Sequence, residues 1–482
     1  CLPLFGALFE RQLFGSEDVW LRARLALEAG NRSLAKTVIQ YLPPVQRPDP
    51  RLIDSIARKP QKYLERVPLP LKSRAQQELA VYALYKAAES WPLLAAQRLR
   101  EIEDNLPEPL RSYAWGQVAM VAAWNHNPNA LDWFSRADES TLSDVQLAWK
   151  ARAALRAFDW NALVSTIDAM TPRGRMEPQW RYWKARALAA QGRQPEANLL
   201  LAPLSNEFNF YGQLAAEDLG AAISSVPQTY RASEEEIKAI AEDPGIRRAL
   251  TLYRVGLRYE GALEWQWTVR DFDDRRLLAA AELALRNEWY ERAIHTAERT
   301  AILHDFSLRY PAPYREAMQG ITAQLDLDEA WVYGLIRQES RFVSTARSGA
   351  GAAGLMQLMP STAKWVAKRL GFKQHHSSLV DGVDTNLNLG TYYLRQMLSS
   401  LDNRIVVASA AYNAGPRRAQ QWLASRPLEG AIYAETIPYP ETRDYVKKVM
   451  SNTMYYARLF RQTTLSLRDR LGVVPARPRQ DD

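Results

Sequence analysis

Residues 336–363 read IRQESRFVSTARSGAGAAGLMQLMPSTA, with one acid, Glu339, in front of a run of small residues. Val332, Leu335 and Ile336 precede this acid at the spacing of one helix face, and Glu339 takes the next position on that face. The sequence therefore predicts a helix that turns the carboxyl group of Glu339 toward the core. Burial raises the pKa of a carboxyl group, and a carboxyl that stays protonated near neutral pH can serve as a general acid.

The alternative is a structural role, in which Glu339 ends its helix and pairs with Arg341 or Arg347. Structural ion pairs also shift the pKa of carboxyl groups, so the two interpretations can be distinguished only from the neighbouring residues. The helix itself is predicted to begin at Asp326, because Glu329 follows at the spacing of a capping box.

The segment after the acid has almost no side chains. It reads SGAGAAG at 348–354, and such a run lets a ligand or another backbone approach closely. Gln357 then supplies a hydrogen-bonding amide, Met356 and Met359 supply adaptable apolar walls, and Pro360 is predicted to open a new helix. Small-residue loops are common, so this pattern alone does not establish a site.

A second polar pair lies in AAYNAGPRR at 410–418, where Tyr412 and Asn413 precede a Gly-Pro turn. A tyrosine hydroxyl near an acid can stabilise charge that develops in a reaction. The alternative is a tyrosine that only packs against the turn.

The bulk composition is that of a globular chain with several domains. Its 482 residues are 47% hydrophobic and 24% charged, and this length predicts about two to four domains. The net charge of +8 favours an anionic partner such as a bacterial wall or a nucleic acid. Basic and acidic residues alternate, however, and form no block of the kind that binds nucleic acid. No run reaches the ~18 apolar residues of a membrane helix.

The sequence predicts no metal site. The single cysteine, Cys1, supplies neither an intrachain disulfide nor a zinc cluster, and the five histidines lack a metal-binding spacing. Two of them, His375 and His376, are adjacent on a predicted loop. The start CLPLFGALF is too short for a complete signal peptide, and we interpret it as a truncation in preference to a lipidated Cys1.

The N-terminal part repeats a helical unit. WKARA occurs at 149–153 and again at 183–187, an offset of 34 residues, and residues 20–43 and 113–137 have the same shape. Each unit reads as an Ala- and Leu-rich helix, a polar break and a second helix, which predicts a tetratricopeptide-like solenoid. Its tryptophans are predicted to be packing wedges, with stacking against sugars as the alternative.

The repeats stop at residues 221–245, where Pro227, an acidic run and Pro244-Gly245 predict a connector. We predict an all-α fold in three parts. They are an α-superhelical domain of helix pairs at 1–228, a helical linker domain at 229–309 and a further domain at 310–482. RIVVAS at 404–409 is β-branched but is interpreted as helix, because an Ala-rich segment continues it.

Five motifs in one order give residues 310–460 a resemblance to the catalytic domain of the soluble lytic transglycosylases, which is similar to goose-type lysozyme. They are QES at 338–340, SGAGAAGLMQLMPSTA at 348–363, NLGTYYL at 388–394, AYNAG at 411–415 and ETIPYPETRDYVKKV at 435–449. The upstream superhelix and linker domain resemble the same family more weakly. The resemblance implies a lysozyme-like catalytic domain at 310–482.

The resemblance implies site residues at the positions of this chain that match the family's motifs. It implies that Glu339 is the single catalytic acid and base, and that Ser348, Gln357 and Met359 line the sugar subsite at the cleaved bond. These are expectations that the resemblance carries onto the matching positions of this chain.

The resemblance implies three further site residues, and for one of them it leaves two roles open. Tyr412 matches the tyrosine near the acid, and Asn413 matches its neighbour in the same motif. Glu435 matches an acidic position of the pocket, or it only fixes local structure. The family also has additional superhelix before a segment like CLPLFGALFERQLFG, so a disulfide partner of Cys1 can be missing from this chain.

The reaction implied by the resemblance needs one carboxyl group and no cofactor. Glu339 protonates the oxygen between N-acetylmuramic acid and N-acetylglucosamine, and the N-acetyl group of the substrate stabilises the cation, an exception to the two-carboxylate rule. Glu339 then accepts the proton of the muramyl 6-hydroxyl, which closes a 1,6-anhydro ring without water. The sequence cannot place Asp381, Asp384, Glu435 or Asp444 close enough to act as a nucleophile.

Two rival functions stay open. The first is a hydrolase, in which water attacks in place of the 6-hydroxyl. The second is a helical-repeat scaffold that binds glycan without cutting it, although the intact Glu339, Gln357 and Tyr412 argue against this. The substrate implies the periplasm of a Gram-negative bacterium, and the repeats are predicted to dock other cell-wall enzymes.

Overall fold

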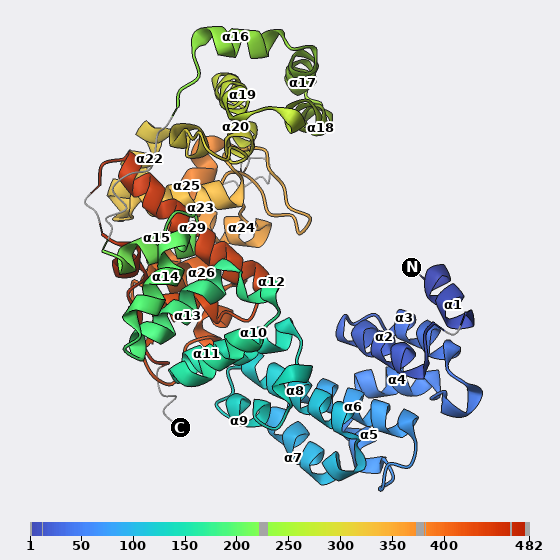
Figure 1. Cartoon of the computed structure of the whole chain (residues 1–482). Coiled ribbons are helices and arrows are strands. Elements are labelled where there is room, and N and C mark those ends of the chain that lie inside the picture. Colours follow the sequence, from blue (N-terminus) through green and yellow to red (C-terminus); the bar gives the residue numbers. More distant parts are fainter. Residues whose placement is uncertain are drawn as a thin grey trace. The chain divides into compact units, whose positions relative to one another are not determined.

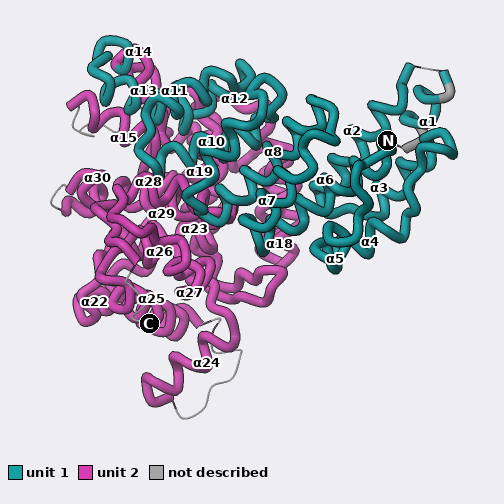
Figure 2. Tube along the Cα trace, turned by 90° about the horizontal axis from the view of Figure 1, so that it is seen from below, with its two compact units in different colours: residues 1–197 teal, residues 198–482 magenta. Residues whose placement is uncertain are grey.

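The computed structural model describes residues 2–11, 13–220, 230–372, 380, 382–462 and 465–477. These residues form two compact units, residues 1–197 and residues 198–482, shown in Figure 2. Helices dominate both units. The described strands are only β1 (Leu428–Glu429) and β2 (Val473–Val474), which pair antiparallel. The all-α prediction is confirmed.

The first unit is a succession of helix pairs along the part of Figure 1 that runs from blue to green. Its α-helices are α1 (Leu2–Glu10), α2 (Ser16–Glu28), α3 (Arg32–Val38), α4 (Pro50–Arg58), α5 (Pro60–Arg66), α6 (Arg74–Ala88), α7 (Pro92–Ile102), α8 (Glu108–Trp124), α9 (Ala130–Phe134), α10 (Asp144–Ala157), α11 (Trp160–Ala169), α12 (Pro172–Arg175), α13 (Pro178–Ala190) and the start of α14 (Gln194–Leu204). Short 3-10 helices lie between them at η1 (Ile39–Tyr41), η2 (Pro44–Gln46), η3 (Glu103–Asn105) and η4 (Glu139–Thr141).

Each pair in this unit packs on the next. Helix α6 contacts both α7 and α8, and α8 contacts α9 and α10. Tryptophans fill the layers: Trp115 and Trp183 are fully buried, and Trp149 is nearly so. The prediction that repeat tryptophans are packing wedges is confirmed for these residues, whereas Trp91 is 47% exposed.

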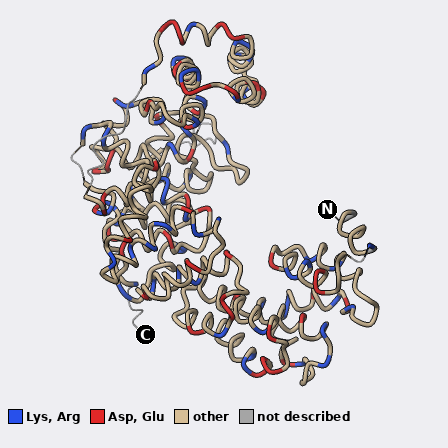
Figure 3. Tube along the Cα trace, viewed as in Figure 1, with Lys and Arg blue, Asp and Glu red and all other residues tan. Residues whose placement is uncertain are grey.

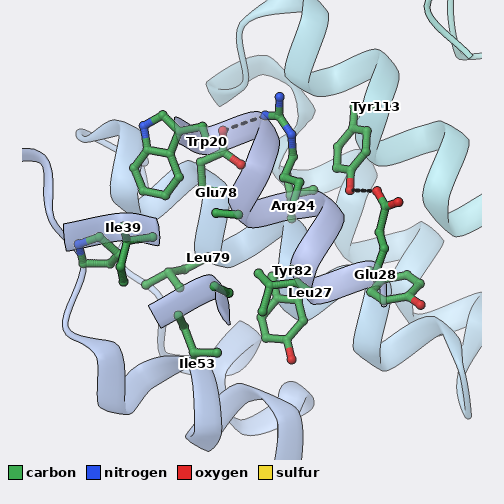
Figure 4. Close-up of a pocket in the computed structure, with 15 residues that line it drawn as sticks. Trp20, Arg24, Leu27, Glu28, Ile39, Ile53, Glu78, Leu79, Tyr82 and Tyr113 are labelled. Atoms are coloured by element: carbon green, nitrogen blue, oxygen red, sulfur yellow. Dashed lines mark hydrogen bonds and ion pairs between the residues drawn. The ribbon is translucent and has the colours of Figure 1, made fainter. Parts of the chain in front are cut away.

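A buried polar cluster surrounds a small cavity among α2, α6 and α8, drawn in Figure 4. Arg24 pairs with Glu78 at 2.8 Å, and the hydroxyl of Tyr113 donates to Glu28. Burial raises the pKa of both acids, while their arginine and tyrosine partners counteract the rise. The cavity has a volume of about 30 Å³, which is room for about one water molecule.

The second unit holds the remaining elements. They are the end of α14, then α15 (Phe210–Asp218), α16 (Glu234–Glu242), α17 (Pro244–Arg254), α18 (Arg258–Thr268), η5 (Val269–Asp271), α19 (Asp274–Arg286), α20 (Tyr290–Ala297), α21 (Phe306–Arg309), α22 (Arg315–Leu325), α23 (Glu329–Glu339), α24 (Pro360–Arg369), α25 (Val383–Ser399), α26 (Ile405–Ala414), α27 (Pro416–Gln421), α28 (Gly430–Glu435), α29 (Pro440–Leu459) and α30 (Leu467–Leu471).

Helices α16 to α20 have a core of their own around Trp265 and Trp289. The prediction of a connector over 221–245 is wrong for its described part, because the acidic run forms α16. Ser233 and Glu236 cap that helix reciprocally, and acids in a first turn are favoured by the helix dipole. Pro244 occupies the first turn of α17, where proline is tolerated. Pro227 lies outside the described residues.

Two local predictions about helices near the Glu339 segment have opposite outcomes. Five of the six residues of RIVVAS, 405–409, lie in α26 as predicted, and Arg404 is its N-cap. The predicted start of the helix at Asp326 is wrong: Asp326 has φ +49° and ends α22, and Asp328 caps α23 by accepting from the amide of Ala330 at 2.9 Å. Aspartate is suited to both positions, since it caps helices and tolerates the left-handed region.

Helix α23 packs closely on α29. A Cβ on Gly334 would lie 2.9 Å from the carbonyl oxygen of Val449 and 2.9 Å from the amide nitrogen of Thr453, so glycine permits this approach. Asn452 also donates to the carbonyl of Gly334 at 3.2 Å. This packing fixes the C-terminal end of α23, where Glu339 lies.

Charges are interspersed along the chain in both units, as Figure 3 shows. Where the structure is described, we find no helix that is both long enough and apolar enough to cross a membrane.

Candidate active site

Glu339 is the last residue of α23, and the apolar stripe before it is buried as predicted. Val332 and Leu335 have no exposed surface, and Ile336 is 1% exposed. Burial raises the pKa of Glu339 to about 7, and the negative charge of Glu441 adds to the rise. Arg341 and Arg347 are not among the groups that set this pKa. The side chain is therefore a carboxyl poised between its two protonation states near neutral pH.

Tyr445 on α29 is the hydrogen-bond partner of this acid. Its hydroxyl donates to Oε1 of Glu339 at 2.6 Å, and this bond lowers the pKa that burial raises. Burial and the charge of Glu339 raise the pKa of Tyr445 well above its usual value. Tyr445 thus remains a neutral donor, and Oε2 of Glu339 is left to carry a proton.

The loop after α23 is fixed by Asn386 of α25, which is 1% exposed. Its amide accepts from the backbone of Met356 at 2.8 Å and donates to the carbonyls of Ala353 and Val380. Gly354 has φ +81°, and a Cβ there would meet the Asn386 amide at 2.0 Å. The small residues of this run therefore allow a buried amide to hold the backbone.

Gln357 closes the same loop. Its backbone has φ +46°, and its Nε2 donates to the carbonyls of Ala346 at 3.0 Å and Gly354 at 2.8 Å. The amide nitrogen is thus used within the loop, which leaves the carbonyl oxygen as the group available to a ligand. Pro360 then begins α24 as predicted.

Tyr412 lies beside the acid. Its hydroxyl donates to the carbonyl of Met356 at 2.7 Å, and its ring contacts that of Tyr393 at 5.4 Å between centroids. The charge of Glu339 contributes to raising the pKa of Tyr412, so the two groups interact electrostatically. Asn413 accepts a hydrogen bond from Thr442 of α29 at 2.6 Å. The structure thus brings Glu339, Tyr412 and Asn413 together around one end of α29.

Ser348 and Met359 lie on the exposed part of the loop. The Oγ of Ser348 accepts from the amide of Ala352 at 3.0 Å, which shapes the turn of small residues. Met359 is 41% exposed and precedes α24. Both residues are accessible from solvent on the segment that Gln357 closes.

Glu435 has no exposed surface. It pairs with Lys447 of α29 at 3.0 Å and accepts from the hydroxyl of Tyr211 on α15. Lys447 also lies over the ring of Tyr211, at 5.2 Å from its centroid. These contacts match the structural one of the two roles that the sequence leaves open for Glu435.

Three residues of the site were not singled out from the sequence: Tyr445, Glu441 and Asn386. Tyr445 and Glu441 lie within the motif ETIPYPETRDYVKKV, but the sequence does not show which residue of that motif reaches the acid. Asn386 lies two residues before NLGTYYL, and only the fold of the Gly354 loop shows its role.

The described residues contain no group of three or more His, Cys, Asp or Glu side chains that could hold a metal ion. His375 and His376 lie outside the described residues.

Family comparisons match three separate stretches of the chain. Residues 316–432 match the Transglycosylase SLT domain, residues 239–304 the Soluble lytic murein transglycosylase L domain, and residues 436–464 the Soluble lytic transglycosylase helical domain. The first stretch contains every site residue described above except Glu435 and the residues of α29.

Individual proteins resemble almost the whole chain. The soluble lytic murein transglycosylase of Escherichia coli is 27% identical over 448 residues, which are 90% of this chain and 68% of that protein. The structure of an inactive mutant of the lytic transglycosylase Slt from Pseudomonas aeruginosa is similar with a TM-score of 0.82 and 30% identity, and covers 97% of this chain and 76% of that one. The 70 kDa soluble lytic transglycosylase of Escherichia coli has the same fold, with a TM-score of 0.76 at 24% identity over 98% of this chain and 76% of that one.

Proposed function

The chain belongs to the family of soluble lytic murein transglycosylases and is a lytic transglycosylase of peptidoglycan, and we propose that Glu339 alone performs both proton transfers of its reaction. The observation that carries this proposal is the position of Glu339 at the end of α23, where its Oε1 accepts a hydrogen bond from Tyr445 and burial raises its pKa to about 7. A group with this pKa can both donate and accept a proton near neutral pH.

In the first step, Glu339 protonates the oxygen that joins N-acetylmuramic acid to N-acetylglucosamine. Tyr445 supports this step because its bond to Oε1 orients the carboxyl group and leaves the proton on Oε2. The bond between C1 of muramic acid and that oxygen breaks, and the N-acetyl group of the substrate stabilises the positive charge. Glu339 becomes a carboxylate, which the hydroxyl of Tyr445 stabilises.

In the second step, the carboxylate of Glu339 accepts the proton of the muramyl 6-hydroxyl. The 6-oxygen bonds to C1 and closes a 1,6-anhydro ring, so no water is consumed and Glu339 returns to its acid form. The reaction needs neither a metal nor a cofactor. Glu441 supports the cycle because its negative charge favours the protonated form of Glu339.

The substrate is proposed to contact the loop that follows α23 and the pair Tyr412 and Asn413 near Glu339. Ser348 and Met359 are exposed on the loop, and the carbonyl oxygen of Gln357 is available to accept from a sugar. Tyr412 and Asn413 complete the subsite from α26. Glu435 is proposed to have a structural role and not to contact the substrate, since its buried contacts hold α28 and α29 to α15.

We keep the three-part division of the chain as a proposal. The superhelical domain is 1–228, the linker domain 229–309 and the catalytic domain 310–482. The matches to the L domain and to the SLT domain fall inside the second and third parts, which supports it.

The proposed location is the periplasm of a Gram-negative bacterium, because peptidoglycan lies there. The proposed partners are glycan strands at the catalytic domain and other cell-wall enzymes at the helical repeats. We propose no nucleic-acid partner, since charges of both signs alternate along the chain (Figure 3).

The test is mass spectrometry of the soluble products that wild type and Glu339→Gln release from purified peptidoglycan. We expect wild type to release muropeptides lighter by one water than those with a reducing end, and Glu339→Gln to release none. Products with reducing ends would establish a hydrolase instead. Binding without release by wild type would establish a glycan-binding scaffold.

A further inference from the structure

A groove of about 640 Å³ lies in the first unit among α4, α5 and α6, and no residue of the site described above lines it. Its volume is within the range of known ligand pockets. It adjoins the small cavity of Figure 4, with which it shares Pro48 and Leu79. The residues that line it are Pro48, Leu52, Ser55, Lys59, Lys62, Tyr63, Arg66, Val67, Pro68, Ala75, Gln76 and Leu79.

One wall of the groove is cationic. Lys59, Lys62 and Arg66 follow one another at spacings of three and four residues, which places them on one face of α5 and the residue before it. All three are exposed, and none forms an ion pair with any described residue. Tyr63 lies on the same face between them.

No acid lines the groove. Of the acids nearby, Asp54 is paired with Lys36 and Arg32, and Glu78 is paired with Arg24 and Arg74. Glu65 is on α5 but does not line the groove. The three cations therefore meet no compensating charge on the lining, and their field favours an anionic ligand.

The rest of the groove lining is apolar with a few polar groups. Leu52, Val67 and Leu79 supply the apolar surface. Gln76 uses its carbonyl oxygen to cap α6, where it accepts from the amides of Lys72 and Ser73, and no described group accepts from its Nε2. The groove thus offers contact for small apolar side chains and a neutral donor in addition to the cations.

The spacing of the cations selects an extended ligand. Lys59 and Arg66 are seven residues apart, which is about 10 Å along a helix axis. A compact anion cannot contact charges spread over this length, whereas an extended peptide covers it with about three residues.

We propose that this groove binds a short anionic peptide, the stem peptide of peptidoglycan, through Lys59, Lys62 and Arg66. The choice of this peptide rests on the proposed function, because the substrate presents it on every strand with several free carboxylates. The first unit would then hold the wall by its peptides, independently of the glycan contacts at Glu339. Exposed contacts of this kind are screened by salt, so the binding weakens as ionic strength rises.

The test is calorimetric titration of the full chain carrying Glu339→Gln, which binds without cutting. The probes are the free stem peptide cut from Gram-negative peptidoglycan by an amidase, and the peptide-free glycan strands that remain. The groove variant adds Lys59→Gln, Lys62→Gln and Arg66→Gln. The control variant adds Arg173→Gln, Lys238→Gln and Arg247→Gln, which also removes three exposed cations, none of them in the groove or in an ion pair with a described residue.

We expect the groove variant to bind the stem peptide at least about tenfold more weakly than the control variant, with both variants binding peptide-free strands alike. Equal binding of the peptide by the two variants would overturn the proposal. Displacement of the peptide by an equal concentration of citrate, a compact tricarboxylate, would also overturn it, because the groove would then select charge alone. Failure of the proposed function is distinguishable: it would appear as the absence of anhydro products from wild type, whatever the titration gives.

Discussion

At the scale of single residues, the chemistry of Glu339 depends on its pKa, which two influences raise and one lowers. Burial favours the protonated carboxyl, Glu441 adds a like charge, and the hydroxyl of Tyr445 favours the carboxylate. Burial is the largest, so the pKa rises to about 7. Removing Tyr445 or Glu441 should therefore move this pKa in opposite directions.

Tyr445→Phe should raise the pKa of Glu339, because the carboxylate loses its donated hydrogen bond. The alkaline limb of the profile of kcat/KM against pH should shift to higher pH, and the rate should fall about tenfold because the carboxylate intermediate loses a charge-assisted hydrogen bond. Glu441→Gln should shift the same limb to lower pH, because a like charge is removed. Rates of anhydro-muropeptide release across pH measure both variants, and shifts in the same direction would contradict this account of the site.

Glu339→Gln should stabilise the folded chain at alkaline pH. The folded-state pKa of about 7 lies above the ordinary value of 4.5, so folding binds a proton between these values and stability falls as pH rises through that window. Below about pH 4.5 the acid is protonated in both states, and no penalty exists. Glutamine keeps an acceptor for Tyr445 but carries no charge.

The free energy of unfolding of Glu339→Gln, measured in urea, should therefore exceed that of wild type by about 3 kcal/mol at pH 8.5 and by little at pH 4. A gain of equal size at both pH values would show that the buried charge is not its cause.

The sequence indicated the acid and its stripe because both lie on one helix, where spacing alone sets the direction of a side chain. It could not indicate that Tyr445 reaches Glu339, since these residues are on helices 106 positions apart. Asn386 was missed for the same reason: its partners are backbone groups of a loop whose path follows from the fold. The sequence could not show which role Glu435 takes, because its hydrogen-bond partner Tyr211 lies 224 residues earlier in the chain.

At the scale of elements, the pair of α23 and α29 is what positions the acid. Glu339 is carried by one helix and Tyr445 by the other, so the hydrogen bond between them depends on how closely the helices approach. Arg337 adds a second link, because it donates to Asn452 of α29 at 3.1 Å and pairs with Glu298 at 2.6 Å. The close contact at Gly334 is the part of this pair that a single substitution can test.

Gly334→Ala should destabilise the chain by about 1 to 3 kcal/mol, because its Cβ would meet backbone atoms of Val449 and Thr453 that cannot rotate away. Gly320→Ala is the matched control, since this glycine lies within α22 and a Cβ there meets nothing within 4 Å. The control should gain about 0.5 to 1 kcal/mol from the better helix propensity of alanine. Urea unfolding measures the free energy of unfolding of both variants. If both variants were less stable than wild type, the close approach of α23 and α29 would not be the reason for the effect at Gly334.

The presence of helices was predictable because apolar periodicity is strong in this chain. Even the β-branched residues 405–407 lie in a helix, α26. Helix ends were less predictable, because Asp326 and Asp328 both suit a terminus and only the backbone of Asp326 distinguishes them. The acidic run at 234–236 was misread as a connector, although acids in a first turn are favoured by the helix dipole.

At the scale of the whole molecule, each of the two compact units has its own buried acid paired with cations. Glu78 in the first unit, with a 4% exposed side chain, pairs with Arg24 and Arg74. Glu435 in the second is fully buried and pairs with Lys447. Arg74 and Glu78 lie one turn apart on α6, a spacing that the sequence shows. The pairs of Glu78 with Arg24 and of Glu435 with Lys447 join different helices, so sequence patterns cannot reveal them.

These two acids allow the units to be tested separately by calorimetry. Glu78→Gln breaks the buried ion pair with Arg24, and Glu435→Gln breaks the one with Lys447. Breaking a buried ion pair by removing one partner costs about 3 kcal/mol or more. Since the partners of each acid lie in the same unit, Glu78→Gln should lower the melting temperature of one transition and Glu435→Gln that of another. If both variants instead lowered a single shared transition by the same amount, the units would unfold as one, and the anionic groove ligand of the first unit would then stabilise the catalytic region as well.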